Sequence, residues 1–111
     1  MSENEVFDTH LQELRRGTVV LACLRLLVTP GYGYGLLEEL AARGFATDAN
    51  TLYPLLRRLE KQGYLRSEWN TDEARPRKFY RTSETGAALA RTMTADFRAI
   101  ADAIAALPEE G

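Results

Sequence analysis

The 111-residue sequence contains only one cysteine and one histidine, Cys23 and His10. A single cysteine excludes an internal disulfide, and this pair is too few for a zinc site of ordinary ligand spacing. Because Cys23 lies within an apolar segment, we expect a buried structural thiol, which fits a reducing cytoplasm. The sequence predicts no metal site and no cofactor.

Long apolar runs are also absent. The longest spans residues 18–28 and is interrupted by Arg25, whereas a membrane-spanning helix needs about 20 apolar residues. The first five residues are acidic and lack the basic start of a secretory signal. We therefore expect a soluble cytoplasmic protein with no membrane partner.

Catalytic constellations are lacking as well. His10 stands in a polar segment, so no Ser-His-Asp set can be built around it. The glycines of 31–35 lack the Lys-Ser/Thr pair and the preceding strand of a phosphate-binding loop, and they predict a turn. The neighbouring Glu38 and Glu39 fall on an exposed helical face. The sequence does not predict an enzyme.

The charges are unevenly distributed, although the formal net charge is only −2. Residues 50–81 contain eight Lys/Arg and four Asp/Glu, a net charge of +4, so the remaining six bases and twelve acids carry −6. A basic segment on an acidic body is typical of a nucleic-acid-binding surface, with an ordinary solvated surface as the alternative.

The apolar periodicity of the first half predicts three helices. Residues 1–8 are polar and predict a flexible N-terminal arm. Thr9 and Gln12 form a capping-box pattern, so we expect a helix from about Thr9 to about residue 28, with Gly17 weakening it. Two short helices follow, one whose apolar positions run from Leu36 to Ala41 after the glycine turn, and one with its N-cap close to Asn50.

The second half changes period. Residues 64–70 and 77–82 predict two strands of a hairpin, and Ser83 can cap a last helix that ends before Pro108. The order helix, helix, helix, strand, strand, helix predicts a mainly α (α+β) winged helix-turn-helix domain over 9–82, with the wing at 64–82. Residues 83–107 form the expected C-terminal dimerisation helix.

The expected interface joins the first and last helices of two chains. Apolar residues of the last helix follow steps of 4, 4, 3, 4 and 3, a coiled-coil-like seam that is longer than a small core can cover. The predicted dimer-interface residues are Leu11, Leu14, Leu89, Met93, Phe97, Ile100, Ile104 and Leu107.

Polar and basic side chains occupy the face of the third helix opposite its leucines. Arginine and asparagine can bond base edges, and tyrosine, threonine and a helix N-terminus suit phosphate oxygens. The alternative is a solvated helix face beside an ordinary basic hairpin tip. The predicted DNA contacts are Asn50, Thr51, Tyr53, Pro54, Arg57, Arg58 and Lys61 on the helix, with Arg75, Arg77 and Lys78 on the wing.

Three aromatic residues of the hairpin, Trp69, Phe79 and Tyr80, leave two interpretations open. They could form a platform on which a base or a small molecule stacks. They could instead pack the wing onto the helices, which we favour.

Several motifs together resemble the PadR family of bacterial transcriptional regulators, over residues 11–107. The most specific are Thr51-Leu52-Tyr53-Pro54, Arg58-Leu59-Glu60 and Pro76-Arg77-Lys78-Phe79-Tyr80-Arg81. The resemblance implies a nucleoid-associated homodimeric repressor whose third helix enters the major groove of palindromic operator DNA. It implies the same helix and wing contacts except Lys61, adds Tyr34 as a phosphate contact, and places the last helix against the partner's first helix.

The single C-terminal helix places the chain with the short members of that family. Some of these bind planar molecules at the dimer interface through an aromatic residue of the last helix, where this chain has Phe97 and no tryptophan. A small hydrophobic or aromatic effector is therefore one alternative function. A protein–protein interaction module built on the same winged helix is another.

Overall fold

The computed structural model describes residues 2–72 and 74–110 and has an α+β winged helix-turn-helix fold, as predicted. The elements in chain order are α1 (Glu3–Arg15), α2 (Thr18–Leu26), β1 (Gly31–Tyr32), α3 (Gly33–Ala42), α4 (Ala49–Lys61), β2 (Leu65–Asn70), β3 (Arg77–Thr82) and α5 (Glu84–Ala105).

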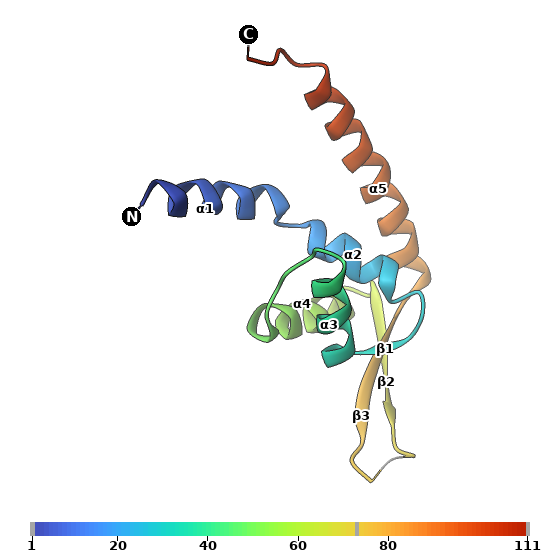
Figure 1. Cartoon of the computed structure of the whole chain (residues 1–111). Coiled ribbons are helices and arrows are strands. Elements are labelled where there is room, and N and C mark those ends of the chain that lie inside the picture. The colour runs from blue at the N-terminus through green and yellow to red at the C-terminus, as the bar shows by residue number, and fades with distance from the viewer. Residues whose placement is uncertain (1, 73, 111) are drawn as a thin grey trace.

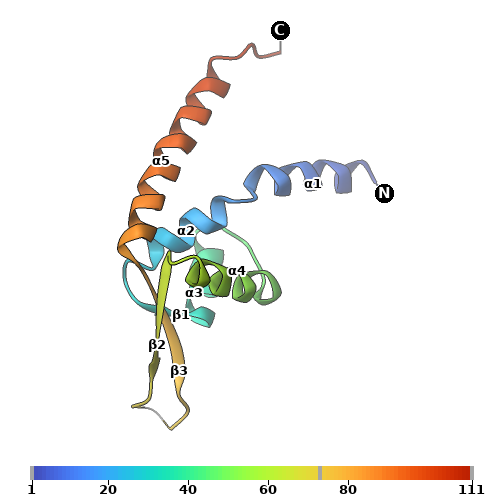
Figure 2. The ribbon, with the colours of Figure 1, turned by 180° about the vertical axis from the view of Figure 1, so that it is seen from behind.

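The elements form a small body from which three parts project. Helices α2, α3 and α4 and the base of the sheet make up the body, and the β2–β3 hairpin extends from one side of it (Figure 1). Helices α1 and α5 leave the opposite side in different directions, as the view from behind also shows (Figure 2). The principal extents of 61 × 35 × 22 Å describe an elongated molecule.

The core is built mainly from leucines of the three body helices. In α4, Leu52, Leu55, Leu56 and Leu59 are buried at the i, i+3, i+4, i+7 spacing of one helical face. Each fully buried leucine contributes about 1.5–3 kcal/mol relative to an exposed one. This inward face fixes which side of α4 points to solvent.

The first helix differs from the prediction at both ends. It begins at Glu3, within the expected flexible arm, because the Ser2 hydroxyl accepts a hydrogen bond from the Glu5 amide at 3.1 Å and acidic residues favour the N-terminal turn. It ends at Arg15, because Gly17 adopts φ +91° and separates α1 from α2. Residue 1 of the expected arm lies outside the described residues.

The helix cap before α4 is Asp48 rather than Asn50. Its carboxylate accepts a hydrogen bond from the Thr51 amide at 2.8 Å. Pro54 stands inside the helix, beyond its first turn. The helix tolerates it because the unpaired carbonyl, that of Asn50, lies on the exposed side, where water can bind it.

The sheet has three antiparallel strands in the order β1-β3-β2, one more than the predicted hairpin. The two-residue strand β1 pairs Gly31 with Tyr80 and Tyr32 with Phe79. A strand this short shows no periodicity in the sequence, so only its distant partner reveals it. It ties the wing to the body, aided by Thr82, whose amide donates to the Leu27 carbonyl at 2.8 Å.

The last helix begins as predicted. The Ser83 hydroxyl accepts a hydrogen bond from the Gly86 amide at 3.0 Å and donates to the Gly63 carbonyl at 2.6 Å. Helix α5 ends at Ala105, before the expected residue 107. Within residues 2–72 and 74–110, none of the helices combines the length and hydropathy that a membrane span requires.

Candidate nucleic-acid interface

The outer face of α4 is basic and open to solvent. Because the leucines turn inward, Asn50, Thr51, Pro54, Arg57, Arg58 and Lys61 are all exposed. None of Arg57, Arg58 and Lys61 forms an ion pair with any described residue. Their charges are therefore available to an external anion.

Tyr53 is the predicted α4 residue that lies partly inside the molecule. Its ring covers Gly33 at the start of α3, so closely that a Cβ added there would stand 2.5 Å from Tyr53 Cε1. Gly33 is therefore needed to seat this ring. The contact brings the two helices of the helix-turn-helix together at their N-terminal ends.

A hollow of about 400 Å³ lies between these helix starts and the wing. It gathers five predicted contacts from three separate segments: Tyr34, Tyr53, Arg75, Arg77 and Lys78. Tyr32, Gly33 and Tyr80 complete its lining. Phenolic hydroxyls beside guanidinium groups suit the phosphate oxygens of a nucleic-acid backbone.

Arg77 joins the wing to the start of α3. Its Nη1 donates to the Tyr34 hydroxyl at 2.7 Å, and its guanidinium lies 5.2 Å from the centre of that ring and 5.6 Å from the Tyr32 ring. The Asn70 side-chain Nδ2 donates to the Tyr32 hydroxyl at 2.9 Å. These contacts hold Tyr34 and Arg77 side by side at the surface.

The prediction implied that Lys78 lies at the wing tip, but the structure places it elsewhere. Strand alternation turns it toward the body, where it is half-buried and its Nζ lies 2.9 Å from Glu60 Oε1 and 5.2 Å from the centre of the Tyr80 ring. Ser67 Oγ donates to the other oxygen of the same carboxylate. One carboxylate of α4 is thus bound to both strands of the wing.

This small network changes the acidity of its members. The Ser67 hydroxyl and then Lys78 hold the pKa of the Glu60 carboxyl below its ordinary value, against the opposing effect of burial. The Glu60 carboxylate in turn raises the pKa of Lys78. Sequence reasoning missed Glu60 and Ser67, although Ser67 follows buried Leu65 by two residues and so shares the inward face of β2.

The remaining wing residues separate into two groups. Tyr80 is buried and Phe79 is half-buried, edge-on to Tyr32 at 6.1 Å between ring centres, so both pack the wing onto the body. Trp69 is 63% exposed and Arg75 is exposed. The favoured packing role therefore holds for Phe79 and Tyr80 but does not describe Trp69.

Most of the predicted interface residues face solvent. Leu89 and Met93 are instead half-buried and pack on the core of their own chain. Exposed on α1 and in the C-terminal part of the chain are Leu11, Leu14, Phe97, Ile100, Ile104 and Leu107.

Comparison with known proteins identifies the family of the chain. Residues 20–92 match the model of the transcriptional regulator PadR-like family. The chain is 39% identical over 69 residues to transcriptional regulator Rv3488 of Mycobacterium tuberculosis, and the match covers 62% of each protein. Similarity to this relative therefore extends over less than two thirds of its length.

Two solved structures extend the comparison. The PadR family transcriptional regulator from Eggerthella lenta is 42% identical, with a TM-score of 0.91 over 97% of this chain and 96% of that one. A transcriptional regulator from Clostridium thermocellum is 25% identical, with a TM-score of 0.79 over 87% and 96% of the two chains. These relatives are regulators rather than enzymes. Because residues 20–92 match the family model and the solved relatives share the winged-helix fold, the chain belongs to the PadR-like family of transcriptional regulators.

Proposed function

We propose that this regulator binds palindromic operator DNA as a homodimer and represses a nearby gene. Helix α4 enters the major groove, and the wing lies along the adjacent backbone. The observation that carries the proposal is the row of unpaired cations on the exposed face of α4, next to the hollow that holds Tyr34 and Arg77.

The contacts divide by chemistry. Arg57 and Arg58 can bond guanine edges bidentately, and Asn50 can do the same with adenine. Tyr34, Tyr53 and Arg75, beside the helix starts, suit phosphates and set the orientation of the protein on the duplex.

A two-fold symmetric dimer would bind an operator made of two symmetric half-sites. The exposed apolar residues of α1 and α5 supply a surface for a second copy. A dimer that places two α4 helices about one DNA turn apart reads half-sites about 10 bp apart, or a multiple of that distance.

The test measures binding to DNA from the gene's own promoter region by fluorescence anisotropy. The pair Arg57→Ala and Arg58→Ala should weaken binding about tenfold or more, because each arginine contact is worth about 1–3 kcal/mol. The matched control is Arg43→Ala, a cation directly after α3 that is already paired with Glu39 at 3.1 Å. Rising salt should also weaken wild-type binding steeply through counterion release.

The exposed face of α4 would not be the DNA-binding surface if the triple variant with Tyr53→Ala, Arg57→Ala and Arg58→Ala bound the promoter as tightly as the wild type. If micromolar wild-type protein gave no specific complex with genomic DNA at moderate salt, a protein–protein module would be the better description.

A small hydrophobic effector is a second candidate function. Phe97 borders a hollow of about 430 Å³ between α2 and α5, whose other walls include Leu21, Leu26 and Phe45. Planar aromatic compounds should raise the melting temperature if they bind there. No stabilisation by any member of such a panel would count against this function.

A further inference from the structure

Trp69 is the only tryptophan of the chain, and nothing within the fold accounts for its exposure. Its side chain is 63% exposed, although tryptophan is highly buried on average in folded proteins. Within residues 2–72 and 74–110, no aromatic ring or cation stacks on it. It borders neither of the two hollows described above, so it does not complete either of them as a pocket for a small molecule.

Strand alternation places Trp69 on the side of the wing that faces α4. It shares that side of β2 with Leu65, which is buried, and with Ser67, which is half-buried and donates to Glu60 of α4. Its cross-strand neighbour is Lys78, which binds the same carboxylate from β3. Burial therefore falls along this face as β2 leaves the body, and Trp69 stands beyond the hydrogen bond that joins the strand to α4.

The wing carries Trp69 well past the body. In both views the hairpin extends beyond α3 and α4, which lie to one side of it (Figures 1 and 2). Trp69 is four residues beyond Leu65, a distance of about 13 Å along an extended strand. With α4 in a major groove, as proposed above, the α4-facing side of the wing lies over the adjacent DNA backbone and reaches the minor groove beyond it.

The charges around Trp69 suit a polyanionic partner. Arg57 and Lys61 are exposed on the outer face of α4, and Arg75 is exposed in the turn between β2 and β3. Glu68, the acidic neighbour in β2, belongs to the opposite face of the strand. An apolar ring within a cationic surface can pack on the sugars and bases of DNA while the cations bind phosphates.

Two hydrogen bonds fix the strand on either side of Trp69. Before it, Ser67 donates to Glu60 of α4. After it, the Asn70 side-chain Nδ2 donates to the Tyr32 hydroxyl at 2.9 Å. An exposed ring binds more tightly when its position is set before the partner arrives, because less conformational freedom is lost on binding. The backbone that carries the indole is therefore already held in place.

We propose that Trp69 is a DNA contact of the wing, and that its indole packs on deoxyribose rings and base edges of the minor groove next to the major groove that receives α4. The proposal rests on the DNA binding proposed above and adds a contact that neutralises no phosphate. Such a contact strengthens binding by removing apolar surface from water and not by releasing counterions. It should therefore differ from the arginine contacts in its dependence on salt.

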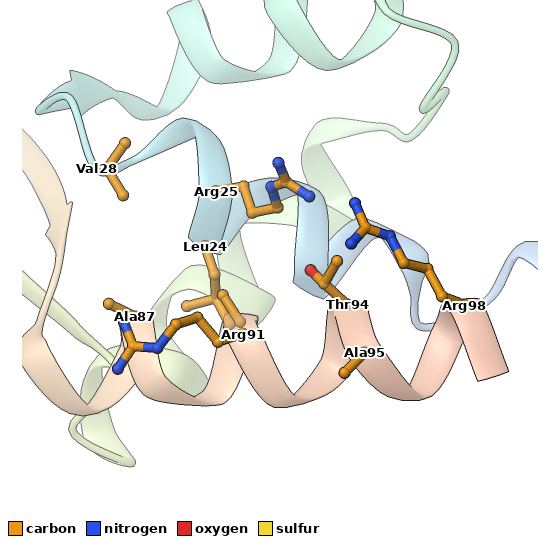
Figure 3. Close-up of a pocket in the computed structure, with 9 residues that line it drawn as sticks. Leu24, Arg25, Val28, Ala87, Arg91, Thr94, Ala95 and Arg98 are labelled. Carbon is orange, nitrogen blue, oxygen red and sulfur yellow. The ribbon is translucent and has the colours of Figure 1, made fainter.

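The first test uses the intrinsic fluorescence of the wild-type protein, which reports on Trp69 alone. Titration with DNA from the gene's own promoter region should quench the emission and shift it to shorter wavelength, because the ring leaves water. The matched control is Trp69→Phe with Ala95→Trp. It moves the tryptophan to an exposed position on α5, beside a hollow on the side of the body away from the wing (Figure 3). The emission of this control should not change when DNA binds.

The second test compares affinity and salt dependence by fluorescence anisotropy of labelled promoter DNA. Trp69→Ala should weaken binding about tenfold, within the range of aromatic contacts to nucleic acid, and should leave the slope of log K against log salt unchanged. Trp69→Phe should lose less affinity, because a phenyl ring keeps an apolar face. Arg75→Ala, the comparison on the same wing, should reduce the slope by about one. Circular dichroism and melting temperature check that each variant is folded.

Promoter binding that leaves the emission of Trp69 unchanged would overturn the contact while leaving DNA binding by α4 in place. Equal affinities of Trp69→Ala and wild type would do the same. A folded Trp69→Ala whose salt slope fell as it does for Arg75→Ala would also overturn it, because the loss would then come from phosphate contacts. A wild-type protein that bound no DNA would overturn the proposed function itself.

Discussion

Glu60 links the helix proposed to read DNA to both strands of the wing, through Lys78 and Ser67. We predict that Glu60→Gln lowers the free energy of unfolding by about 1 kcal/mol at neutral pH, since the pair is half-buried and the amide keeps a weaker hydrogen bond. Urea denaturation measures this difference. Glu68→Gln, an exposed carboxyl of β2, is the control and should change stability little.

The pair of Glu60 and Lys78 also predicts how the difference in the free energy of unfolding between wild type and Glu60→Gln depends on pH. The pKa of Glu60 is lower in the folded chain than in the unfolded one, so its stabilising effect is complete above the unfolded value of about 4.3 and is lost as the pH falls through the folded value. The pKa of Lys78 is raised, so its contribution is lost only in strongly alkaline solution. This account would be contradicted if the free energies of unfolding of wild type and Glu60→Gln differed by the same amount at neutral pH and at pH about 2.

Cys23 is fully buried on α2, and burial raises the pKa of its thiol to about 12. The thiolate is the reactive form, so we predict that the native protein resists Ellman's reagent at pH about 8 and reacts with it on unfolding. The absorbance of the released thiolate follows the reaction with and without guanidinium chloride. Rapid stoichiometric labelling of the native chain would show that α2 opens locally.

At the scale of the elements, Gly17 sets the boundary between α1 and α2. Its φ of +91° is in the left-handed region, so Gly17→Ala should destabilise the protein by about 1–2 kcal/mol in denaturant titrations. Gly35→Ala is the matched control, because Gly35 lies inside α3 with open space around it, where alanine should stabilise slightly. If Gly17→Ala stabilised the protein as much as Gly35→Ala does, the break between α1 and α2 would not depend on the left-handed conformation of Gly17.

The start of α5 is held against the end of the α4–β2 turn by Gly86. A Cβ at this position would lie 2.1 Å from the backbone oxygen of Tyr64, which cannot move as a side chain does. We predict that Gly86→Ala lowers the free energy of unfolding by about 3 kcal/mol, at the upper end of overpacking costs, and tilts α5. Ala88→Ser, on an exposed position of the same helix, serves as the control. An unfolding midpoint equal to that of the wild type would contradict the close packing.

The whole chain is more extended than an independent domain of its size. Its radius of gyration is 16.7 Å, whereas a compact chain of this length has about 13 Å. Exposed apolar residues occur on both projecting helices, including Phe7 and Phe97. A second copy would cover these surfaces. We predict that the melting temperature rises with protein concentration, as it does for proteins stabilised by self-association. A melting temperature independent of concentration would indicate a stable monomer.

Local patterns were enough to predict several parts of this structure. The leucine spacing gave the inward face of α4, alternation gave β3 at residues 77–82, and Ser83 was identified as the cap of α5. The exposed positions of Arg57 and Arg58 follow from the same spacing. These features depend on residues within a few positions of one another, whose geometry a helix or strand determines by itself.

Contacts between distant residues were decided only by the tertiary structure. Tyr34 and Arg77 are 43 positions apart, and Glu60 and Lys78 are 18 apart. No periodicity links such residues, so neither the Lys78–Glu60 pair nor strand β1 can be predicted from the sequence. A side chain's charge and a helix face are local properties, but whether another segment folds against them depends on how the whole core packs.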